Sequence, residues 1–335
     1  MLLDRAGAPA SMDHGLREPE AARPWGVATE TGELTDVLLC APAFLELVPC
    51  NSVSRESIAR GLFASPALAA RQHQALAAAL ERNGVRCHFV APSPGLADLC
   101  FTRDAVLMSP WGLIELRPAA PHRRAEPGVA ARAAAAFGVP HLGRVPEGSI
   151  EGGDICLLRE GVLVVGHSGD RTDARGARAL GALFESRGWE VIHTRFDRRF
   201  LHLDTLFTMV SNDCAVARTE ALEDDFLAHL GRLGIGIIPA SADEVGGLGA
   251  NLLSLGKGRL VAPARNERLN AILTGCGFEV IALDLDQFTR CGGGAHCLTM
   301  PLARRHVEMP GDMSSGGARR IADSIAGTGQ RGLQL

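Results

Sequence analysis

The chain contains no tyrosine, and aromatic residues make up only 4% of its 335 positions. Proteins that bind single-stranded nucleic acid rely on such side chains to stack against bases. The arginines are scattered rather than clustered, and the formal net charge is −4. We therefore expect no nucleic acid among the partners of this protein.

Long apolar runs are also missing, and no stretch reaches the length needed to span a bilayer. The N-terminus carries Asp4, Asp13, Glu18 and Glu20 and has no apolar segment typical of a signal peptide. The nine cysteines have no regular spacing and form no CxxC pair, which argues against a zinc ribbon or a thioredoxin-like motif. We expect a cytoplasmic protein with free thiols, no membrane partner, and no metal or cofactor.

What is present indicates a folded protein with a sizeable core, because 46% of the residues are hydrophobic and 21% are charged. Residues 1–30 are rich in alanine, proline, arginine and glutamate without periodicity, and we predict a flexible N-terminal arm there. Residues 305–335 are rich in glycine, serine and arginine, and we predict a C-terminal tail. The remaining residues, 31–304, form a single predicted domain. The sequence leaves the oligomeric state open, with a homodimer as one option.

A helix-like segment that ends in a glycine and is followed at once by a short β-rich run occurs five times. A glycine just after a helix can adopt the left-handed conformation that other residues avoid. The intervals between these glycines are 54, 50, 46 and 43 residues. Repetition in a fixed order at this period is typical of a propeller or a solenoid. The five glycines are Gly84, Gly138, Gly188, Gly234 and Gly277.

Helices and strands follow a plan that differs from an ordinary doubly wound sheet. The clearest helices are predicted over 66–82, 174–187 and 222–233, where strong helix formers carry apolar residues at helical spacing. Pairs of strand candidates lie between the helices, whereas doubly wound folds repeat one strand and one helix. The sequence therefore predicts an α/β fold of five ββαβ-type modules, arranged as a pseudo-fivefold β/α-propeller around a central axis. The paired strand candidates are 105–109 with 113–116, 155–158 with 162–165, 206–210 with 215–217, and 251–255 with 259–262, and a further one is 37–40.

A glycine-rich stretch near the C-terminus, Cys291-Gly-Gly-Gly-Ala-His296-Cys297, is the first candidate for chemistry. Three consecutive glycines let the backbone come close to a ligand. A cysteine placed beside such a glycine-lined surface is a candidate covalent nucleophile. Taken alone, Cys297 has a second interpretation, because a free cysteine is more often an inert buried thiol.

Polar side chains gather in three further segments. Each has a structural interpretation when taken alone: a hydrogen-bonded histidine, a turn, or an ion pair between Arg103 and a neighbouring carboxylate. His202 and Asp204 are two residues apart, so a strand would place both on one face. The segments are Asp98 with Phe101-Thr-Arg-Asp104, then Glu151-Gly-Gly-Asp154, and then His202-Leu-Asp204-Thr205.

Five modules around an axis would bring these segments together with the Cys297 loop. The set then supplies a thiol, an imidazole and several carboxylates, which suits a cysteine nucleophile that attacks a cationic substrate. A metal site is disfavoured because the ligand spacings of zinc motifs are missing. A free thiol has a pKa of about 8.5, so a nearby positive charge, from the substrate or from protonated His202, has to activate it.

The motifs and their order resemble the guanidine-modifying enzyme (pentein) superfamily, which includes arginine deiminase, dimethylarginine dimethylaminohydrolase and the amidinotransferases. The resemblance covers about 32–304 and implies a five-module β/α-propeller. Its four motifs in this chain are Phe-Thr-Arg-Asp104, Glu151-Gly-Gly-Asp154, His202-Leu-Asp204-Thr-Leu-Phe-Thr, and Gly-Gly-Gly-Ala-His296-Cys297-Leu-Thr-Met-Pro.

The resemblance also implies a role for each matching residue. Cys297 matches the nucleophile, His202 the general acid and base, and Glu151 the carboxylate paired with that histidine. Asp104 and Asp204 match the carboxylates that hold the guanidinium group. The residues matched to the rest of the substrate site are Arg123 (or, one residue on, Arg124) and Arg171 for the α-carboxylate, Asp98 for the amino-acid end, and Gly293 and Gly294 for the backbone floor.

The implied reaction is hydrolysis of the guanidinium group of L-arginine or a close derivative. It runs through an S-alkylthiouronium intermediate on the cysteine and gives citrulline, or a ureido analogue, with ammonia or an amine. The motifs around Arg103 and His202 look more like arginine deiminase than dimethylarginine dimethylaminohydrolase, yet a body of 31–304 is too short for the helical insertion of arginine deiminases. Dimethylarginine hydrolysis and transfer of the amidino group to an amine stay open as alternatives. A non-catalytic propeller that binds a partner is the alternative from a different class.

Overall fold

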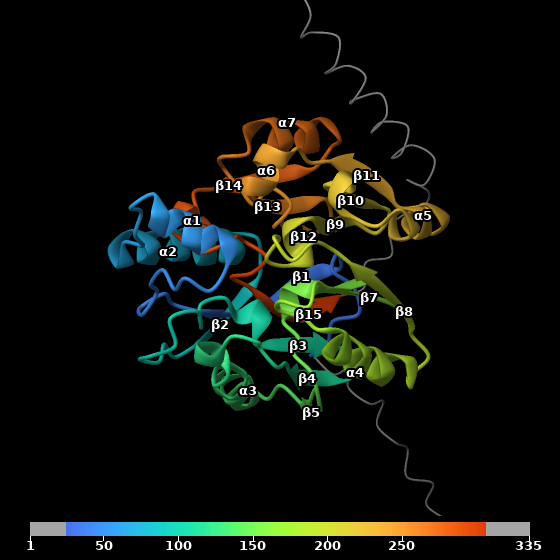
Figure 1. Cartoon of the computed structure of the whole chain (residues 1–335), viewed down its shortest axis with the longest axis horizontal. Helices are drawn as coiled ribbons and strands as arrows, with labels where there is room; N and C mark the ends of the chain where they lie inside the picture. The colour runs from blue at the N-terminus through green and yellow to red at the C-terminus, as the bar shows by residue number, and fades with distance from the viewer. Residues whose placement is uncertain (1–24, 306–335) are drawn as a thin grey trace, which may run out of the picture.

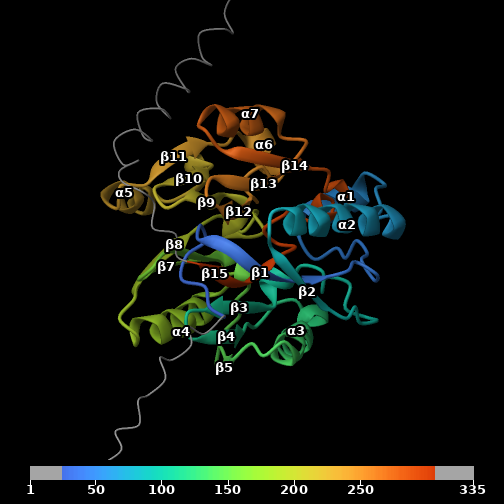
Figure 2. The ribbon, with the colours of Figure 1, turned by 180° about the vertical axis from the view of Figure 1, so that it is seen from behind.

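The computed structural model describes residues 25–305, so the predicted tail beyond 305 and most of the predicted arm lie outside it (Figure 1). The described chain is an α/β structure with five three-stranded sheets. Five helices, α2, α3, α4, α5 and α7, surround the sheets at the periphery in both views (Figures 1 and 2). One plan is repeated in every sheet, as the sequence predicts.

The strands are β1 (Glu33–Cys40), β2 (Arg86–Val90), β3 (Val106–Ser109), β4 (Gly112–Glu115), β5 (His141–Arg144), β6 (Ile155–Arg159), β7 (Val162–His167), β8 (Glu190–Arg195), β9 (Phe207–Ser211), β10 (Cys214–Ala217), β11 (Gly236–Pro239), β12 (Leu253–Gly256), β13 (Arg259–Pro263), β14 (Glu279–Leu283) and β15 (Met300–Arg305). The α-helices are α1 (Ser52–Ala59), α2 (Pro66–Arg82), α3 (Glu126–Ala136), α4 (Ala174–Glu185), α5 (Asp224–Arg232), α6 (Ala242–Gly246), α7 (Glu267–Gly275) and α8 (Asp286–Thr289). The short 3-10 helices are η1 (Thr102–Asp104), η2 (Pro121–Arg123), η3 (Gly152–Asp154), η4 (Leu203–Thr205) and η5 (Thr219–Ala221).

Each sheet has a middle strand that is antiparallel to one neighbour and parallel to the other. In the sheet β3-β4-β5, a tight turn joins the antiparallel strands β3 and β4, and α3 connects β4 to the parallel strand β5. The sheets β6-β7-β8, β9-β10-β11 and β12-β13-β14 repeat this plan with α4, α5 and α7. An antiparallel pair needs only a tight turn, whereas a parallel pair needs a crossover, and here the crossover contains a helix.

The fifth sheet, β15-β1-β2, joins the two ends of the described chain. Strand β15 pairs antiparallel with β1, with Val37 opposite Pro301, and α2 then leads to the parallel strand β2. First strands of different sheets also pack against one another, β6 against β9, β9 against β12, and β15 against β3. The segment that follows the Cys297 loop therefore completes the sheet that the N-terminal part begins.

The five glycines that the sequence singles out all have a positive φ, between +74° and +94°. Four of them directly follow the C-cap residue of a helix, and Gly188 lies two residues after the C-cap Ser186. Each is followed within a few residues by the third strand of its sheet. In this backbone region a side chain is strained, so glycine is the residue that ends the helix without cost. The predicted helix–glycine–strand repeat is confirmed.

One predicted boundary is wrong. Residues 25–30, which the sequence assigns to the arm, pack against the fold: Gly26 forms a β-bridge with Ala303, and Val27 is buried. Glu30 is also buried and pairs with Arg103 at 3.3 Å. The contacts join residues far apart in sequence, so local composition does not reveal them. Within 25–305, no helix is both long and apolar enough to cross a membrane.

Candidate active site

Three short 3-10 helices place the polar motifs at the same position of three sheets. Helix η1 comes just before β3, η3 just before β6, and η4 just before β9. Helix η3 contacts both η1 and η4. The Cys297 loop holds the corresponding position before β15, and Asn251 lies just before β12. The repeated plan thus brings a polar segment of every sheet to one region of the molecule.

His202 and Glu151 form the central buried pair. Nε2 of His202 lies 2.9 Å from Oε2 of Glu151, and both residues are at most 1% exposed. Burial alone would lower the pKa of His202, but the carboxylates of Asp104, Asp154 and Glu151 outweigh it and raise the pKa to about 10. The resting imidazole is therefore protonated at neutral pH, with its second nitrogen, Nδ1, free of any hydrogen-bond partner among residues 25–305.

Glu151 accepts several donors besides His202. Arg171 approaches its Oε2 to 3.3 Å, and the backbone N–H of Ala119 donates to its Oε1 at 3.0 Å. Burial would raise the pKa of Glu151, but the hydrogen bond with His202 and the nearby arginines hold it well below its usual range. Glu151 therefore stays a carboxylate and keeps the proton on His202.

Cys297 is buried, and its thiol contacts two polar side chains. Sγ lies 3.2 Å from Oδ2 of Asp204 and accepts a hydrogen bond from Nδ2 of Asn251 at 3.0 Å. Oδ1 of Asn251 in turn accepts the backbone N–H of Cys297. Burial and then the negative charges of Asp204 and Asp104 raise the pKa of this thiol well above its usual range. The sulfur therefore carries its proton in this arrangement.

Asp204 faces Cys297 and His296 rather than His202. His296 Nδ1 lies 2.9 Å from Oδ2 of Asp204, and Oδ1 has no hydrogen-bond partner among the described residues. The prediction that His202 and Asp204 share one face of a strand is wrong, because Leu203–Thr205 forms η4 and the strand begins only at Phe207. The tight turn directs the two side chains to different partners.

Asp104 already holds a guanidinium group, that of Arg123. Nη1 of Arg123 donates to Oδ2 of Asp104 at 2.8 Å, and its Nε donates to Glu126 at 2.9 Å. The second oxygen of Asp104 accepts the backbone N–H of Gly153. The alternative pairing of Asp104 with Arg103 does not occur, since Arg103 contacts Glu30.

A narrow cavity joins these groups, with an empty volume of about 300 Å³. Cys297, His202 and Asp104 line it together. Asp204, whose Oδ2 contacts Sγ of Cys297, lines a second, smaller cavity. The other predicted residues on its wall are Asp98, Arg123, Arg171 and Gly293. Phe101, Cys291 and Gly292 belong to the motifs quoted above but had no assigned role, and the residues that the sequence analysis missed are Cys50, Asn51 and Leu201.

Hydrogen bonds and close contacts hold three more residues of the cavity wall. Asp98 Oδ2 lies 2.7 Å from Nε2 of His122. Arg171 donates to the backbone oxygen of Cys50 at 3.1 Å and lies 3.3 Å from its sulfur. Asn51 caps α1 and donates to the backbone oxygen of Cys291 at 3.0 Å, which ties the start of α1 to the glycine loop.

The glycine loop needs its glycines for close packing. A Cβ at Gly293 would lie 2.2 Å from the ring of Phe101, and one at Gly294 would lie 2.7 Å from Oδ1 of Asn251. Gly292 alone of the three has a positive φ, +99°. The loop can therefore bring Cys297 against Asn251 and Phe101 only because these positions have no side chain.

Sequence reasoning missed Asn251, the second polar contact of the nucleophile. It lies in Leu-Gly-Ala-Asn, a segment without any charged residue. The available signal was its place just before the first strand of a sheet, where the other four sheets carry their site residues. His296 and Glu30, which lie 3.4 Å apart behind Asp204, left no comparable signal because the contact depends on residues far apart in sequence.

Two groups of side chains among residues 25–305 have atoms close enough to hold a metal ion: Asp104 with Glu151 and His202, and Cys50 with Asp98 and His122. An arginine occupies each group. Arg123 lies 2.8 Å from Asp104, and Arg171 lies 3.3 Å from the sulfur of Cys50. These arginines contact a carboxylate and the sulfur that a metal ion would use as ligands. The geometry instead suits nucleophilic attack by a thiol beside a protonated imidazole.

Comparison with known proteins agrees with this chemistry. The family model described as arginine deiminase matches residues 41–235 and 228–304. An uncharacterized protein of Bacillus subtilis, YkgA, is 29% identical over 278 residues, 82% of this chain and 94% of that protein. An arginine deiminase of Rhodococcus jostii is 33% identical over 192 residues, which are 46% of each chain. The chain spans about half the length of the curated arginine deiminases that it matches.

Solved structures show the same fold. Dimethylarginine dimethylaminohydrolase from Pseudomonas aeruginosa, in complex with citrulline, has a TM-score of 0.68 at 24% identity and covers 80% of this chain and 99% of that one. The N-terminal domain of a cyanobacterial arginine dihydrolase, bound to substrate, has a TM-score of 0.71 at 20% identity, covering 80% and 98%. The chain thus belongs to the arginine deiminase family within the guanidine-modifying superfamily, and it is a hydrolase that acts on carbon–nitrogen bonds of guanidino groups.

Proposed function

We propose that the protein hydrolyses the guanidinium group of L-arginine or a close arginine derivative through a covalent intermediate on Cys297. The products are citrulline, or a ureido analogue, and ammonia or an amine. The observation that carries this proposal is one narrow cavity lined by the Cys297 thiol, the protonated His202 imidazole and the Asp104 carboxylate. These are a nucleophile, a proton donor and a cation-binding group within one enclosed space.

Two carboxylates are suited to hold the planar, permanently charged substrate. Asp204 has an oxygen without a hydrogen-bond partner among the described residues, and Asp104 already binds the guanidinium group of Arg123. A carboxylate accepts two parallel N–H bonds from such a group. In our proposal the substrate guanidinium replaces Arg123 at Asp104.

Arg123, when displaced from Asp104, is proposed to bind another part of the substrate. Once freed from Asp104, its guanidinium can bind the α-carboxylate of the substrate, together with Arg171 on the same cavity wall. Asp98, which also lines the cavity, then faces the α-amino group. The cavity is narrow in its present form, so binding requires this exchange of partners.

Substrate binding also activates the nucleophile. The thiol of Cys297 carries its proton because it is buried beside Asp204 and Asp104. A guanidinium group held by those carboxylates neutralises their charge, so the pKa of the thiol falls and its proton leaves. The thiolate then forms only beside the carbon that it attacks, which protects the enzyme from unproductive reactions.

The steps conserve atoms and protons. The thiolate adds to the guanidinium carbon, and His202 gives a proton to the departing nitrogen, which leaves as ammonia or an amine when its bond to carbon breaks. An S-alkylthiouronium intermediate remains on Cys297. Neutral His202 then takes a proton from water, and the hydroxide adds to the same carbon. The carbon–sulfur bond breaks as the hydroxyl proton of this adduct passes to the sulfur, which releases the ureido product and restores the thiol and protonated His202. The proton that the thiol lost at the start passes to solvent and is there taken up by the released ammonia or amine. Glu151 holds His202 in place through both steps.

A second proposal concerns where the candidate active site lies within the fold. We infer that the five sheets are modules of one pseudo-fivefold ring spanning 31–304, with the site at the end of its axis. The common strand order of the five sheets and the packing of first strands against one another support this arrangement. Each module then contributes the segment just before its first strand.

The direct test is to incubate the purified protein with L-arginine and with a panel of methylated and other guanidino compounds. Hydrolysis yields citrulline and ammonia in equal amounts, whereas dimethylarginine hydrolysis yields dimethylamine, and amidino transfer yields ornithine only when an amine acceptor is present. Cys297→Ser is the control. The proposal fails if no guanidino compound gives a ureido product, or if the serine variant turns over like the wild type.

A further inference from the structure

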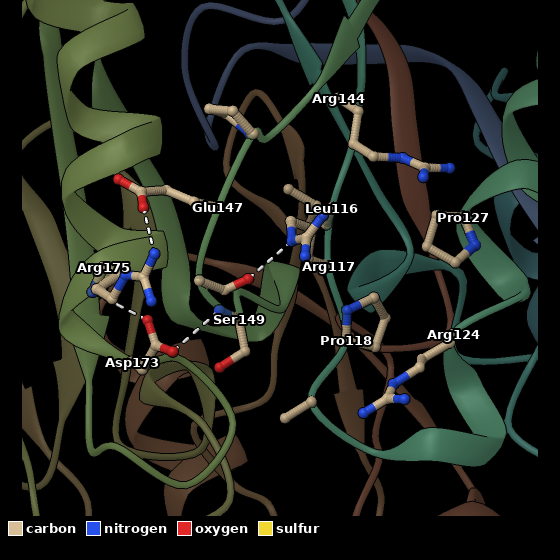
Figure 3. Close-up of a pocket in the computed structure, with 13 residues that line it drawn as sticks. Leu116, Arg117, Pro118, Arg124, Pro127, Arg144, Glu147, Ser149, Asp173 and Arg175 are labelled. Carbon is tan, nitrogen blue, oxygen red and sulfur yellow. Dashed lines mark hydrogen bonds and ion pairs between the residues drawn. The ribbon is translucent and has the colours of Figure 1, made fainter.

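A second cavity lies outside the candidate active site, on the surface between two sheets. It is an open cleft with about 1480 Å³ of empty space. Its walls are the segment after β4, the start of α3, the segment after β5 and the start of α4. Figure 3 shows Arg117 at its centre, Arg124 and Arg144 on one side, and Glu147 with Arg175 on the other.

Two of the four arginines are neutralised by carboxylates. Arg175 donates to Glu147 at 2.6 Å, and Arg144 donates to Glu115 at 2.9 Å. The other two, Arg117 and Arg124, have no carboxylate partner among residues 25–305. Nε of Arg117 donates to the backbone oxygen of Gly148 at 2.8 Å, which leaves its charge uncompensated. The guanidinium group of Arg124 makes no hydrogen bond or ion pair within the described chain.

The remaining carboxylate of the cleft is already occupied. Asp173 caps α4 and accepts backbone N–H groups from Ser149, Arg175 and Gly176 at 3.1, 2.9 and 2.7 Å. It therefore cannot pair with Arg117 without uncapping the helix. Helix α3, whose Pro127 lines the cleft, has no side-chain cap at its N-terminus and carries the buried carboxylate of Glu126 in its first turn.

We propose that this cleft is a binding site for a small multivalent anion that carries phosphate or carboxylate groups. Arg117 and Arg124 supply two uncompensated guanidinium forks, and a guanidinium binds such oxygens through paired hydrogen bonds. Arg144 and Arg175 flank them, and each is already paired with a carboxylate. The cleft is wide and open, which suits a ligand larger than a single halide ion.

The cleft is joined to the candidate active site through the backbone. Arg117 exchanges two backbone hydrogen bonds with Ile150, at 3.1 and 2.9 Å, and Ile150 is followed directly by Glu151. Ala119, on the cleft wall, donates its N–H to Glu151, and Arg124 directly follows Arg123. An anion that shifts these segments therefore acts on the partners of His202 and Asp104. This coupling, which rests on the proposed function, makes the cleft a regulatory site.

Isothermal calorimetry at fixed ionic strength tests the binding site without any need for activity. Pyrophosphate and citrate are the two probes, and they separate phosphate from carboxylate ligands. The cleft variant is Arg117→Gln/Arg124→Gln, and the control, Arg71→Gln/Arg232→Gln, removes the same charge from exposed positions on α2 and α5. The single variant Arg124→Gln removes no side-chain hydrogen bond or ion pair among the described residues and guards against misfolding.

At least one probe is expected to bind the wild type and the control equally, and the cleft variant about tenfold or more weakly, with Arg124→Gln in between. The proposal is overturned if neither probe gives a binding isotherm, or if the cleft variant binds like the control. For the coupling, the bound probe is expected to change kcat or KM for arginine about fivefold in the wild type and the control but not in the cleft variant. Binding without that change overturns the coupling. Absence of any guanidino turnover would contradict the proposed function, while calorimetry still decides the cleft.

Discussion

The variant Asp204→Asn is expected to lose arginine turnover, while the thiol of Cys297 becomes more reactive toward an alkylating reagent. Oδ2 of Asp204 lies 3.2 Å from Sγ of Cys297. Two unit negative charges at that separation repel by about 5 kcal/mol at an effective dielectric constant of about 20. Amide substitution removes this repulsion and keeps the shape of the side chain. It also removes one of the two carboxylates proposed to hold the guanidinium group.

The assay is alkylation by iodoacetamide at neutral pH, quenched over time and quantified on the peptide that contains Cys297. If only about a third of the repulsion is recovered, the thiolate fraction rises by about tenfold or more, and the labelling rate rises with it. Arginine turnover is expected to fall by about a hundredfold or more, since a charged hydrogen-bonded partner of the substrate is lost. Asp225→Asn, on exposed α5, is the matched control. Labelling of Cys297 in Asp204→Asn at the wild-type rate, or more slowly, would refute the reasoning.

Three further predictions concern other residues of the candidate active site and Cys297 itself. Cys297→Ser abolishes turnover but retains arginine binding by calorimetry, and full activity in that variant would remove the mechanism. Arg123→Ala lowers the free energy of unfolding by about 3–5 kcal/mol in urea titrations, because it leaves Asp104 and Glu126 buried without their cation; a loss below about 1 kcal/mol would contradict the buried ion-pair network. The raised pKa of His202 makes protonation of this residue stabilise the folded state, and the contribution is complete below the ordinary histidine pKa of 6.5. It is lost as the pH rises toward about 10. The urea midpoint should therefore decline over this pH range in the wild type, and decline less in His202→Asn.

Much of the fold could be predicted because its signals are local. Gly84, Gly138 and the three later glycines mark helix ends through their own backbone conformation, which depends only on nearby residues. The turns between paired strands are equally local. Residues 25–30 show the limit, because their order comes from Ala303 and Arg103, far along the chain. Composition alone indicates an arm there.

The candidate site likewise has residues that the sequence predicts and contacts that it does not. The motifs of Glu151, His202 and Cys297 stand out in the sequence, and the structure places these residues around one cavity or beside it. The pairing of Arg123 with Asp104 could not be foreseen, because it joins η2 to η1 across 19 residues of sequence and no local motif marks it. Asn251 is an uncharged amide, and its contact with the sulfur forms only when the segment before β12 meets the Cys297 loop, 46 residues further along the chain.

A covalent adduct on the sulfur tests the central claim most directly. The protein is mixed with arginine, quenched in acid within the first turnovers, digested, and examined by mass spectrometry. The account predicts that the peptide containing Cys297 gains the mass of arginine less ammonia, and that the gain is absent from Cys297→Ser. Citrulline formation with an unmodified Cys297 peptide at every time point, in the wild type and in His202→Ala alike, would contradict it.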